Sequence, residues 1–366
     1  MKNILFATTA LVATAGIASA DVSISGFAEI GIQRADTYTA AKAATLGTST
    51  AVAASAADAK VTAGEMQFFQ DIDVTFSMSS ETDSGLSFGA SVDLDETTAG
   101  TTTSDDHGTT VFVSGGFGTV TMGDTDGAFD WALAETGMGG AIADDHTAHA
   151  GYNGNSGLDG KGDGQVLRYD YSINDFGFAV SQEQGSNGAA GSKDITAFGV
   201  TYGMDMGGTA ITFGAGTQDY GGSDRAGVSV KAAMANGFTV VANMSNGTDA
   251  AVAAVSAVQA VYTSGVLTTA PVTAVAAVAK RDVDTMGLGV SYTTGALTVA
   301  ANYGEFDYTG TGNDVAAANK LDTKGYGLAV NYDLGGGAVA QLGYGKSDRD
   351  GALDTDTMSL GIALSF

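Results

Sequence analysis

The chain has 366 residues, of which 41 are acidic and 15 are basic, so its formal net charge is −26. Such an acidic excess argues against nucleic-acid binding, because phosphates require a basic protein surface. The absence of cysteine excludes a disulfide framework and any thiolate metal or redox site. With 44% hydrophobic residues, 54 glycines and one proline, the composition favours many strands joined by glycine-rich turns over a disordered acidic chain.

The first 20 residues have the organisation of a secretory signal. A short basic start precedes an apolar core over 4–17 and a small-x-small cleavage site at Ala18-Ser19-Ala20. We therefore expect residues 1–20 to be removed and residues 21–366 to form one mature domain. Beyond the signal, no 18-residue stretch has the hydrophobicity of a spanning helix, so a membrane location would require a closed sheet.

Segments of alternating apolar and polar residues then follow along the chain, and sixteen of them are predicted to be strands. They cover 22–33, 66–79, 85–95, 108–114, 117–124, 165–173, 176–184, 194–204, 209–218, 226–234, 237–246, 284–293, 296–306, 323–332, 338–347 and 356–366. Seven short connections alternate strictly with eight longer ones, which places all short turns at one rim and all long loops at the other. Outer-membrane barrels have an even number of strands and this sorting of loops, whereas a soluble β-sandwich does not require it.

The last predicted strand distinguishes a membrane barrel from a soluble sheet. In the strand predicted at 356–366, small or polar residues alternate with a row of apolar residues. The apolar row is Met358, Leu360, Ile362, Leu364 and Phe366. A strand ending on an aromatic residue suits a barrel whose outer face is covered by lipid.

The strand predicted at 165–173 alternates in the same way, with Arg168 and Asp170 between apolar neighbours. A charge facing lipid costs roughly 2–4 kcal/mol at the bilayer midplane for Arg or Lys, so the charged row must face a lumen. Sixteen strands enclose an aqueous channel rather than a packed core. The predicted fold is therefore all-β, a 16-stranded antiparallel transmembrane β-barrel.

Several segments resemble one family. Residues 74–92, 110–124, 271–277 and 332–337, together with the terminal Phe366, are similar to alphaproteobacterial general porins of the Rhodobacter type, in the same order along the chain. The resemblance implies a homotrimer in the outer membrane of a Gram-negative bacterium, in contact with lipid and lipopolysaccharide. It also implies passage of small hydrophilic solutes and ions, and a third loop, 125–164, that folds inward and narrows the pore.

The third loop is strongly acidic, and its length alone indicates a function. Against the single Lys161 it carries Asp126, Asp130, Glu135, Asp144, Asp145, Asp159 and Asp163. In the family such carboxylates face a basic cluster on the opposite wall. Here the aligned wall positions are acidic instead: Glu29, Asp71, Asp73, Asp93 and Asp95. Arg168 and Arg34 remain as candidate wall cations.

A uniformly acidic constriction predicts cation selectivity. At about 10 Å in water each charge attracts a monovalent cation by roughly 0.4 kcal/mol, so five sum to about 2 kcal/mol unscreened. Screening with a Debye length of about 8 Å reduces this to roughly 0.6 kcal/mol. The alternative is that some of these carboxylates are protonated, or neutralised by bound Ca²⁺. No other cofactor is expected.

The sequence gives weaker signals for metal binding and for catalysis. Asp144, Asp145, His146 and His149 contain possible metal ligands, but a solvated loop explains them better. Trp131 has two interpretations, a constriction residue or a packing anchor, and packing fits better. We expect no enzymatic activity, because the three histidines fall in loops and no serine–histidine grouping emerges.

Two other classes of function share features with a general porin. A secreted acidic surface protein or adhesin would share the composition, but not the one-sided apolar rows and the sorted loops. A substrate-specific outer-membrane channel is harder to separate, because its selectivity would come from loop geometry.

Overall fold

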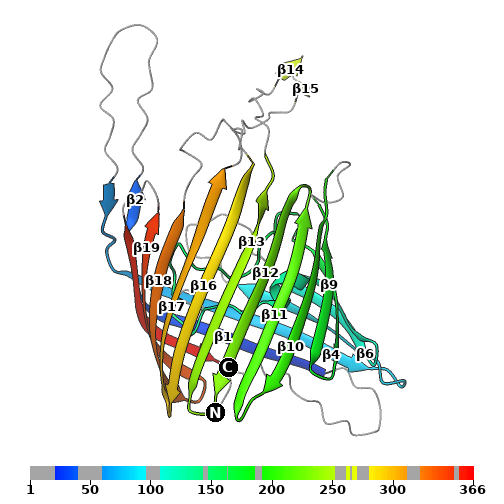
Figure 1. The fold of residues 1–366 in the computed structure, drawn as a ribbon, viewed down its shortest axis with the longest axis horizontal. Coiled ribbons are helices and arrows are strands. Elements are labelled where there is room, and N and C mark those ends of the chain that lie inside the picture. Colours follow the sequence, from blue (N-terminus) through cyan, green and yellow to red (C-terminus); the bar gives the residue numbers. More distant parts are fainter. Residues whose placement is uncertain are drawn as a thin grey trace.

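The computed structural model describes residues 21–39, 60–95, 108–142, 147–162, 164–185, 192–251, 261–263, 266–269, 280–310, 322–349 and 354–366. Within these residues, sixteen antiparallel strands close into a barrel in which neighbours along the chain are neighbours in the sheet (Figure 1). The barrel strands are β1 (Asp21–Ala35), β4 (Gln67–Glu81), β5 (Ser87–Asp95), β6 (Thr109–Gly115), β7 (Gly118–Gly123), β8 (Val166–Ile173), β9 (Phe176–Glu183), β10 (Ile195–Asp205), β11 (Thr209–Tyr220), β12 (Ser223–Met234), β13 (Phe238–Asp249), β16 (Arg281–Thr294), β17 (Leu297–Gly310), β18 (Thr323–Gly335), β19 (Ala338–Arg349) and β20 (Thr355–Ser365). All sixteen predicted strands are thus confirmed.

The structure adds elements that the sequence pattern did not predict. Two short hairpins lie within long connections: β2 (Thr37–Thr39) with β3 (Lys60–Thr62), and β14 (Val261–Thr263) with β15 (Val266–Thr269). A five-residue helix, α1 (Ala128–Ala132), lies in the third connection. These elements are too short to produce a readable hydrophobic period.

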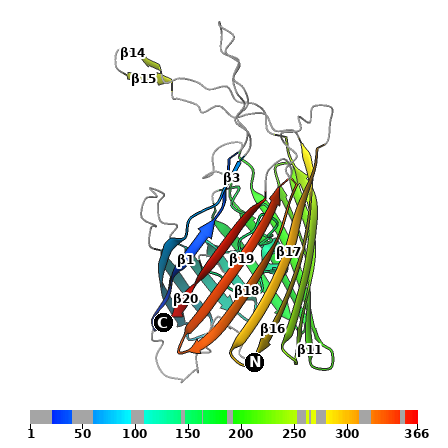
Figure 2. The same cartoon turned by 90° about the vertical axis from the view of Figure 1, so that its left-hand side faces the viewer.

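The barrel closes between its first and last strands. β1 pairs with β20 on one side and with β4 on the other (Figure 2). Gly26 and Phe366 exchange two backbone hydrogen bonds across this seam, at 3.3 and 2.9 Å, while the Phe366 side chain is 80% exposed. The terminal aromatic residue is therefore held in the ladder with its ring facing outward.

The outer surface is apolar. Large exposed hydrophobic side chains follow alternate positions of the strands, among them Ile24 and Ile30 on β1 and Leu328 on β18. Aromatic pairs lie toward both rims: the rings of Phe176 and Tyr202 are 4.7 Å apart near the short turns, and those of Tyr326 and Tyr344 are 6.2 Å apart toward the long connections. Such an exterior suits lipid, with aromatic residues at the membrane interface. No helix among the described residues is long and apolar enough to cross a bilayer.

Candidate functional site: the constriction of the lumen

The connection between β7 and β8, residues 124–165, is called loop 3 below. Its outgoing arm follows the inner wall from β9 towards β20. The amide of Ala128 donates to Ser181 Oγ on β9 at 2.8 Å, and the amide of Ala134 donates to Ser229 Oγ on β12 at 2.9 Å. Further along, Asn331 Nδ2 on β18 donates to the carbonyl of Gly140 at 3.0 Å.

The returning arm follows the same wall in the opposite direction. Thr357 Oγ1 on β20 donates to the carbonyl of Ala148 at 2.8 Å, and the amide of Ala150 donates to Ser347 Oγ on β19 at 2.9 Å. Asn153 Nδ2 then donates to Thr285 Oγ1 on β16 at 3.2 Å. The described parts of both arms thus lie inside the barrel, as predicted for an inward-folded third loop.

A small apolar core fastens the start of loop 3. Phe129 is 1% exposed and packs with Ala128 and Leu133 against wall residues Ala179 and Ala197. Trp131 packs against the edge of this cluster, which agrees with its interpretation as a packing anchor. Helix α1 is therefore held against the inner wall of the barrel by hydrophobic contact.

Glycines on the wall let the backbone of loop 3 approach it directly. A Cβ atom added to Gly199 on β10 would overlap the carbonyl oxygen of Ala128, and one added to Gly345 on β19 would overlap that of Ala148. No other residue fits these two positions unless the loop shifts. In the sequence, glycine at inward positions of a strand, where a lumen wall would otherwise carry polar side chains, indicates such close approach of the loop.

Buried polar side chains fasten the end of loop 3. The carboxylate of Glu183 on β9 accepts the amides of Gly160, Gly162 and Gly164 at 2.9, 2.9 and 3.0 Å. Gln218 on β11 accepts the amide of Leu158 at 2.7 Å. Because charge-assisted hydrogen bonds are roughly twice as strong as neutral ones, Glu183 is a firm attachment point.

The predicted loop carboxylates occupy two environments. Asp126 and Glu135 are exposed to the lumen, and Glu135 accepts a hydrogen bond from the Tyr152 hydroxyl at 2.8 Å. Asp130 and Asp159 are half-buried, and loss of hydration is the main cause that raises their pKa to about 8 and about 6; nearby carboxylates, including Asp126, add to it. Asp144, Asp145, Asp163 and the neighbouring His146 lie outside the described residues.

The predicted wall carboxylates share one face of β1, β4 and β5. In the register, Glu29 lies opposite Asp71 and Asp73 lies opposite Asp95, while Thr75 Oγ1 donates to Asp93 Oδ1 at 2.8 Å. Apolar residues, including Ile72 and Leu94, occupy the other face and are exposed. The acidic row therefore faces the lumen, although Glu29 is buried there and the side chain of Asp95 is outside the described part of the structure.

Arg168 lies on β8, where loop 3 rejoins the wall. Its Nη1 donates to the carbonyl of Asp126 at 2.7 Å and its Nε to Asp170 at 3.3 Å. The arginine thus braces the loop and is already paired with a carboxylate.

The possible metal ligands Asp144, Asp145 and His146 lie outside the described residues, so a site there stays untested. Among the described side chains, no group of three or more His, Asp or Glu residues is arranged to hold a metal ion. His149 instead places its Nε2 2.9 Å from Asn302 Oδ1 on β17, while its Nδ1 accepts the amide of Gly151 at 3.2 Å. Calcium among the carboxylates remains a prediction.

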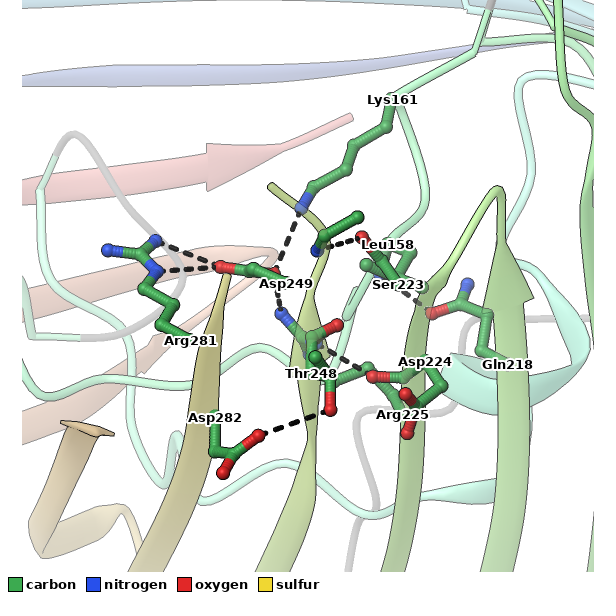
Figure 3. Close-up of polar contacts among 11 residues, drawn as sticks. Leu158, Lys161, Gln218, Ser223, Asp224, Arg225, Thr248, Asp249, Arg281 and Asp282 are labelled. Atoms are coloured by element: carbon green, nitrogen blue, oxygen red, sulfur yellow. Dashed lines mark hydrogen bonds and ion pairs between the residues drawn. The ribbon is translucent and has the colours of Figure 1, made fainter. Parts of the chain in front are cut away.

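A basic cluster was missed by the sequence analysis. Arg225, Arg281 and Lys161 surround the carboxylate of Asp249 at the ends of β12, β13 and β16 (Figure 3). Arg225 and Asp249 lie just beyond the predicted strands 226–234 and 237–246, so no face was assigned to them. Extending the inward rows by a few residues would have brought them together.

A closed sixteen-stranded barrel with an apolar exterior, a polar lumen and an inward-folded third loop defines an outer-membrane channel. The comparisons give the family. The model of the Gram-negative porin family matches residues 7–352, and a porin of Rhodobacter capsulatus is 33% identical over 287 residues, covering 75% of this chain and 86% of that protein. The chain belongs to the Gram-negative porin family, and its location is the outer membrane.

Solved structures support the same fold. A porin refined at 1.8 Å resolution superposes with a TM-score of 0.57 at 24% identity, covering 94% of this chain and all of the other. A variant of Rh. blastica porin gives a TM-score of 0.54 at 17% identity, with the same coverage. The family model and the relative confirm the resemblance noted from the sequence, and these structures confirm the fold.

Proposed function

We propose that this porin is a passive, cation-selective channel for small hydrophilic solutes. The observation that carries the proposal is the position of the acidic residues. Asp71, Asp73 and Asp93 face the lumen from one wall, and Asp126 and Glu135 face it from loop 3. A cation passing between them meets carboxylates on both sides of its path.

The charge of these five carboxylates is large enough to produce cation selectivity. One unit charge about 10 Å away in water changes the energy of a monovalent ion by roughly 0.4 kcal/mol. Five such charges, reduced by salt with a Debye length of about 8 Å, still favour cations over anions several-fold. Asp130, whose pKa is raised to about 8, is largely protonated near neutral pH and adds little to this charge, whereas Asp159, with a pKa of about 6, is mostly ionised there.

The proposed assembly is a homotrimer in contact with lipid and lipopolysaccharide, formed after removal of residues 1–20 and without enzymatic activity. The supports are the signal-like start of the chain and membership of the porin family. Chemical cross-linking of the purified protein in detergent tests the trimer. A monomer as the largest cross-linked species would contradict it.

The selectivity is tested by reconstituting the mature protein in a planar bilayer under a tenfold KCl gradient. We expect a reversal potential of the sign that cation preference gives, and a smaller one for the double variant Asp71→Asn with Asp73→Asn. Asp219→Asn is the matched control, because Asp219 is exposed on the outer face beside the inward Gln218. A reversal potential of the opposite sign in the wild-type protein would refute the selectivity and leave the porin assignment intact.

A further inference from the structure

The basic cluster lies on the inner wall of the barrel. Asp249 is on the same inward row of β13 as Asn243, which contacts loop 3, and it lies opposite Arg281 in the register of β13 and β16. Arg225 is on the same row of β12 as Gly227, beside which Leu133 of loop 3 packs. Lys161 reaches the cluster from the end of loop 3 (Figure 3).

One carboxylate in this cluster forms ion pairs with three cationic side chains. Asp249 Oδ1 lies 2.6 Å from Arg225 Nη2 and 3.7 Å from Lys161 Nζ, and Asp249 Oδ2 lies 2.9 Å from Arg281 Nη2. The four side chains together therefore carry a net charge of about +2 at neutral pH. This is a local positive site in a chain whose net charge is −26.

The three cations differ in what they can still bind. Arg225 is 8% exposed, and its guanidinium also donates to the carbonyls of Asp224 and Thr248 at 2.7 and 3.1 Å, so its donors are largely used. Arg281 is 28% exposed and Lys161 is 44% exposed. Within the part of the chain that the structure describes, Arg281 donates only to Asp249, through Nε and Nη2, which leaves Nη1 for a ligand.

Arg281 is held in place. Its guanidinium carbon lies 4.2 Å from the centre of the Tyr308 ring on β17, in a cation–π contact. With Nε and Nη2 fixed by Asp249, the remaining edge of the guanidinium is oriented before any ligand arrives. Preorganised donors of this kind bind oxyanions well, because little side-chain entropy is lost.

The position of the cluster relative to the acidic wall is defined by the order of strands. β5, with Asp93, and β13, with Asp249, are eight strands apart in both directions around the ring of sixteen. The cluster therefore lies on the side of the lumen opposite the acidic wall. It is also at the strand ends that lead into the longer connections, the external side in outer-membrane barrels.

We propose that Arg281 and Lys161, supported by Arg225 and Asp249, form a binding station for the carboxylate or phosphate group of a small solute at the external entrance of the channel. The station goes beyond the proposed cation selectivity and does not depend on it. It would retain solutes that carry an oxyanion before they reach the constriction. A cluster that serves only to fasten loop 3 to the wall would not bind an added anion.

The experiment is current recording from the trimer or monomer as purified, in a planar bilayer at low KCl, with inorganic phosphate added to one side at a time. Phosphate on the external side should lower the current in a saturable manner, and phosphate on the other side should do so more weakly. Removing one unit charge at about 4 Å in water weakens a singly charged ligand about sixfold. We therefore expect Arg281→Gln and Lys161→Gln each to raise the half-blocking phosphate concentration at least sixfold.

The control is Lys324→Gln, because Lys324 is an exposed lysine of β18 paired with a single carboxylate, Asp348, at 3.2 Å. It should leave the phosphate effect unchanged, and Lys161→Arg should preserve it. Current in KCl alone reports whether loop 3 has moved in any variant. The station is refuted if external phosphate has no saturable effect on the wild-type protein, or if Arg281→Gln blocks as readily as the wild type. Reversal potentials measured on the same membranes decide the cation selectivity separately.

Discussion

Phe129 offers the most direct test of how loop 3 is held. Its ring is 1% exposed and packs closely on two wall glycines. A Cβ atom added to Gly216 would lie 3.1 Å from the ring, and one added to Gly227 would lie 3.0 Å from it. Truncating a buried phenylalanine to alanine costs about 3–5 kcal/mol, because apolar contact is lost and a cavity remains. Since Phe129 belongs to the loop, the cost falls on docking of loop 3 and not on the barrel. Taking about 3 kcal/mol, Phe129→Ala should raise the undocked population roughly 100-fold.

Tryptic cleavage of loop 3 measures that undocked population. Lys161 is the one lysine or arginine in residues 124–165, so trypsin has a single site in loop 3. When undocking is fast relative to cleavage, the cleavage rate follows the undocked population. The fragment boundary at Lys161, read by mass spectrometry on the protein in detergent, therefore reports docking. We expect Phe129→Ala to be cut there roughly 100 times faster than the wild type.

Phe198→Ala is the matched control, because Phe198 is an exposed phenylalanine on the outer face of β10. It should leave cleavage at Lys161 unchanged, and circular dichroism should show an intact barrel in both variants. Equal cleavage of Phe129→Ala and Phe198→Ala would show that the apolar core does not hold loop 3.

Three further predictions follow from the same contacts. Cation preference should increase between about pH 5 and pH 9, because burial raises the pKa of Asp130 to about 8 and that of Asp159 to about 6, so both gain charge as pH rises. Asp130→Asn should remove the upper part of this change, and a reversal potential independent of pH would contradict the assignment. Gly345→Val should alter single-channel conductance by displacing the loop backbone. Gly203→Val should not, because a Cβ atom at this inward position would meet no atom closer than the carbonyl oxygen of Asp175, at 4.0 Å. Equal conductances would argue against close contact at Gly345. Glu183→Gln should increase tryptic cleavage of loop 3 tenfold or more, since hydrogen bonds to a charged group contribute about 1.5–3 kcal/mol, and an unchanged rate would mean that the carboxylate does not hold the loop.

The barrel could be predicted because its strands alternate under a strong constraint. Lipid excludes charge from one face, so residues such as Ile72 and Asp71 must point in opposite directions. The constraint weakens beyond the apolar band. At the end of β12 the outward residue is Asp224 and the inward residue is Arg225, so both faces are polar although the ladder continues. The sequence pattern therefore ended too early there, and the basic cluster was missed.

The path of loop 3 could not be predicted for a different reason. Its contacts are mostly between its own backbone and single wall side chains such as Ser181, Ser347 and Glu183, far away in the chain. Neither hydrophobic period nor local turn chemistry encodes such pairs. The acidic composition of the loop was readable, but burial of Asp130 and Asp159, which decides whether they are charged, depends on docking.

The seam between β1 and β20 bears on how the protein is made. Phe27 is paired with Ser365, so the ring cannot be completed until the C-terminal strand has been synthesised and delivered to the N-terminal one. Contacts this distant in sequence form slowly, and unpaired strand edges invite aggregation while they wait. A chain truncated before β20 would leave one edge of β19 and one edge of β1 without hydrogen-bond partners in hydrocarbon, so the last dozen residues decide whether biogenesis yields a membrane protein at all.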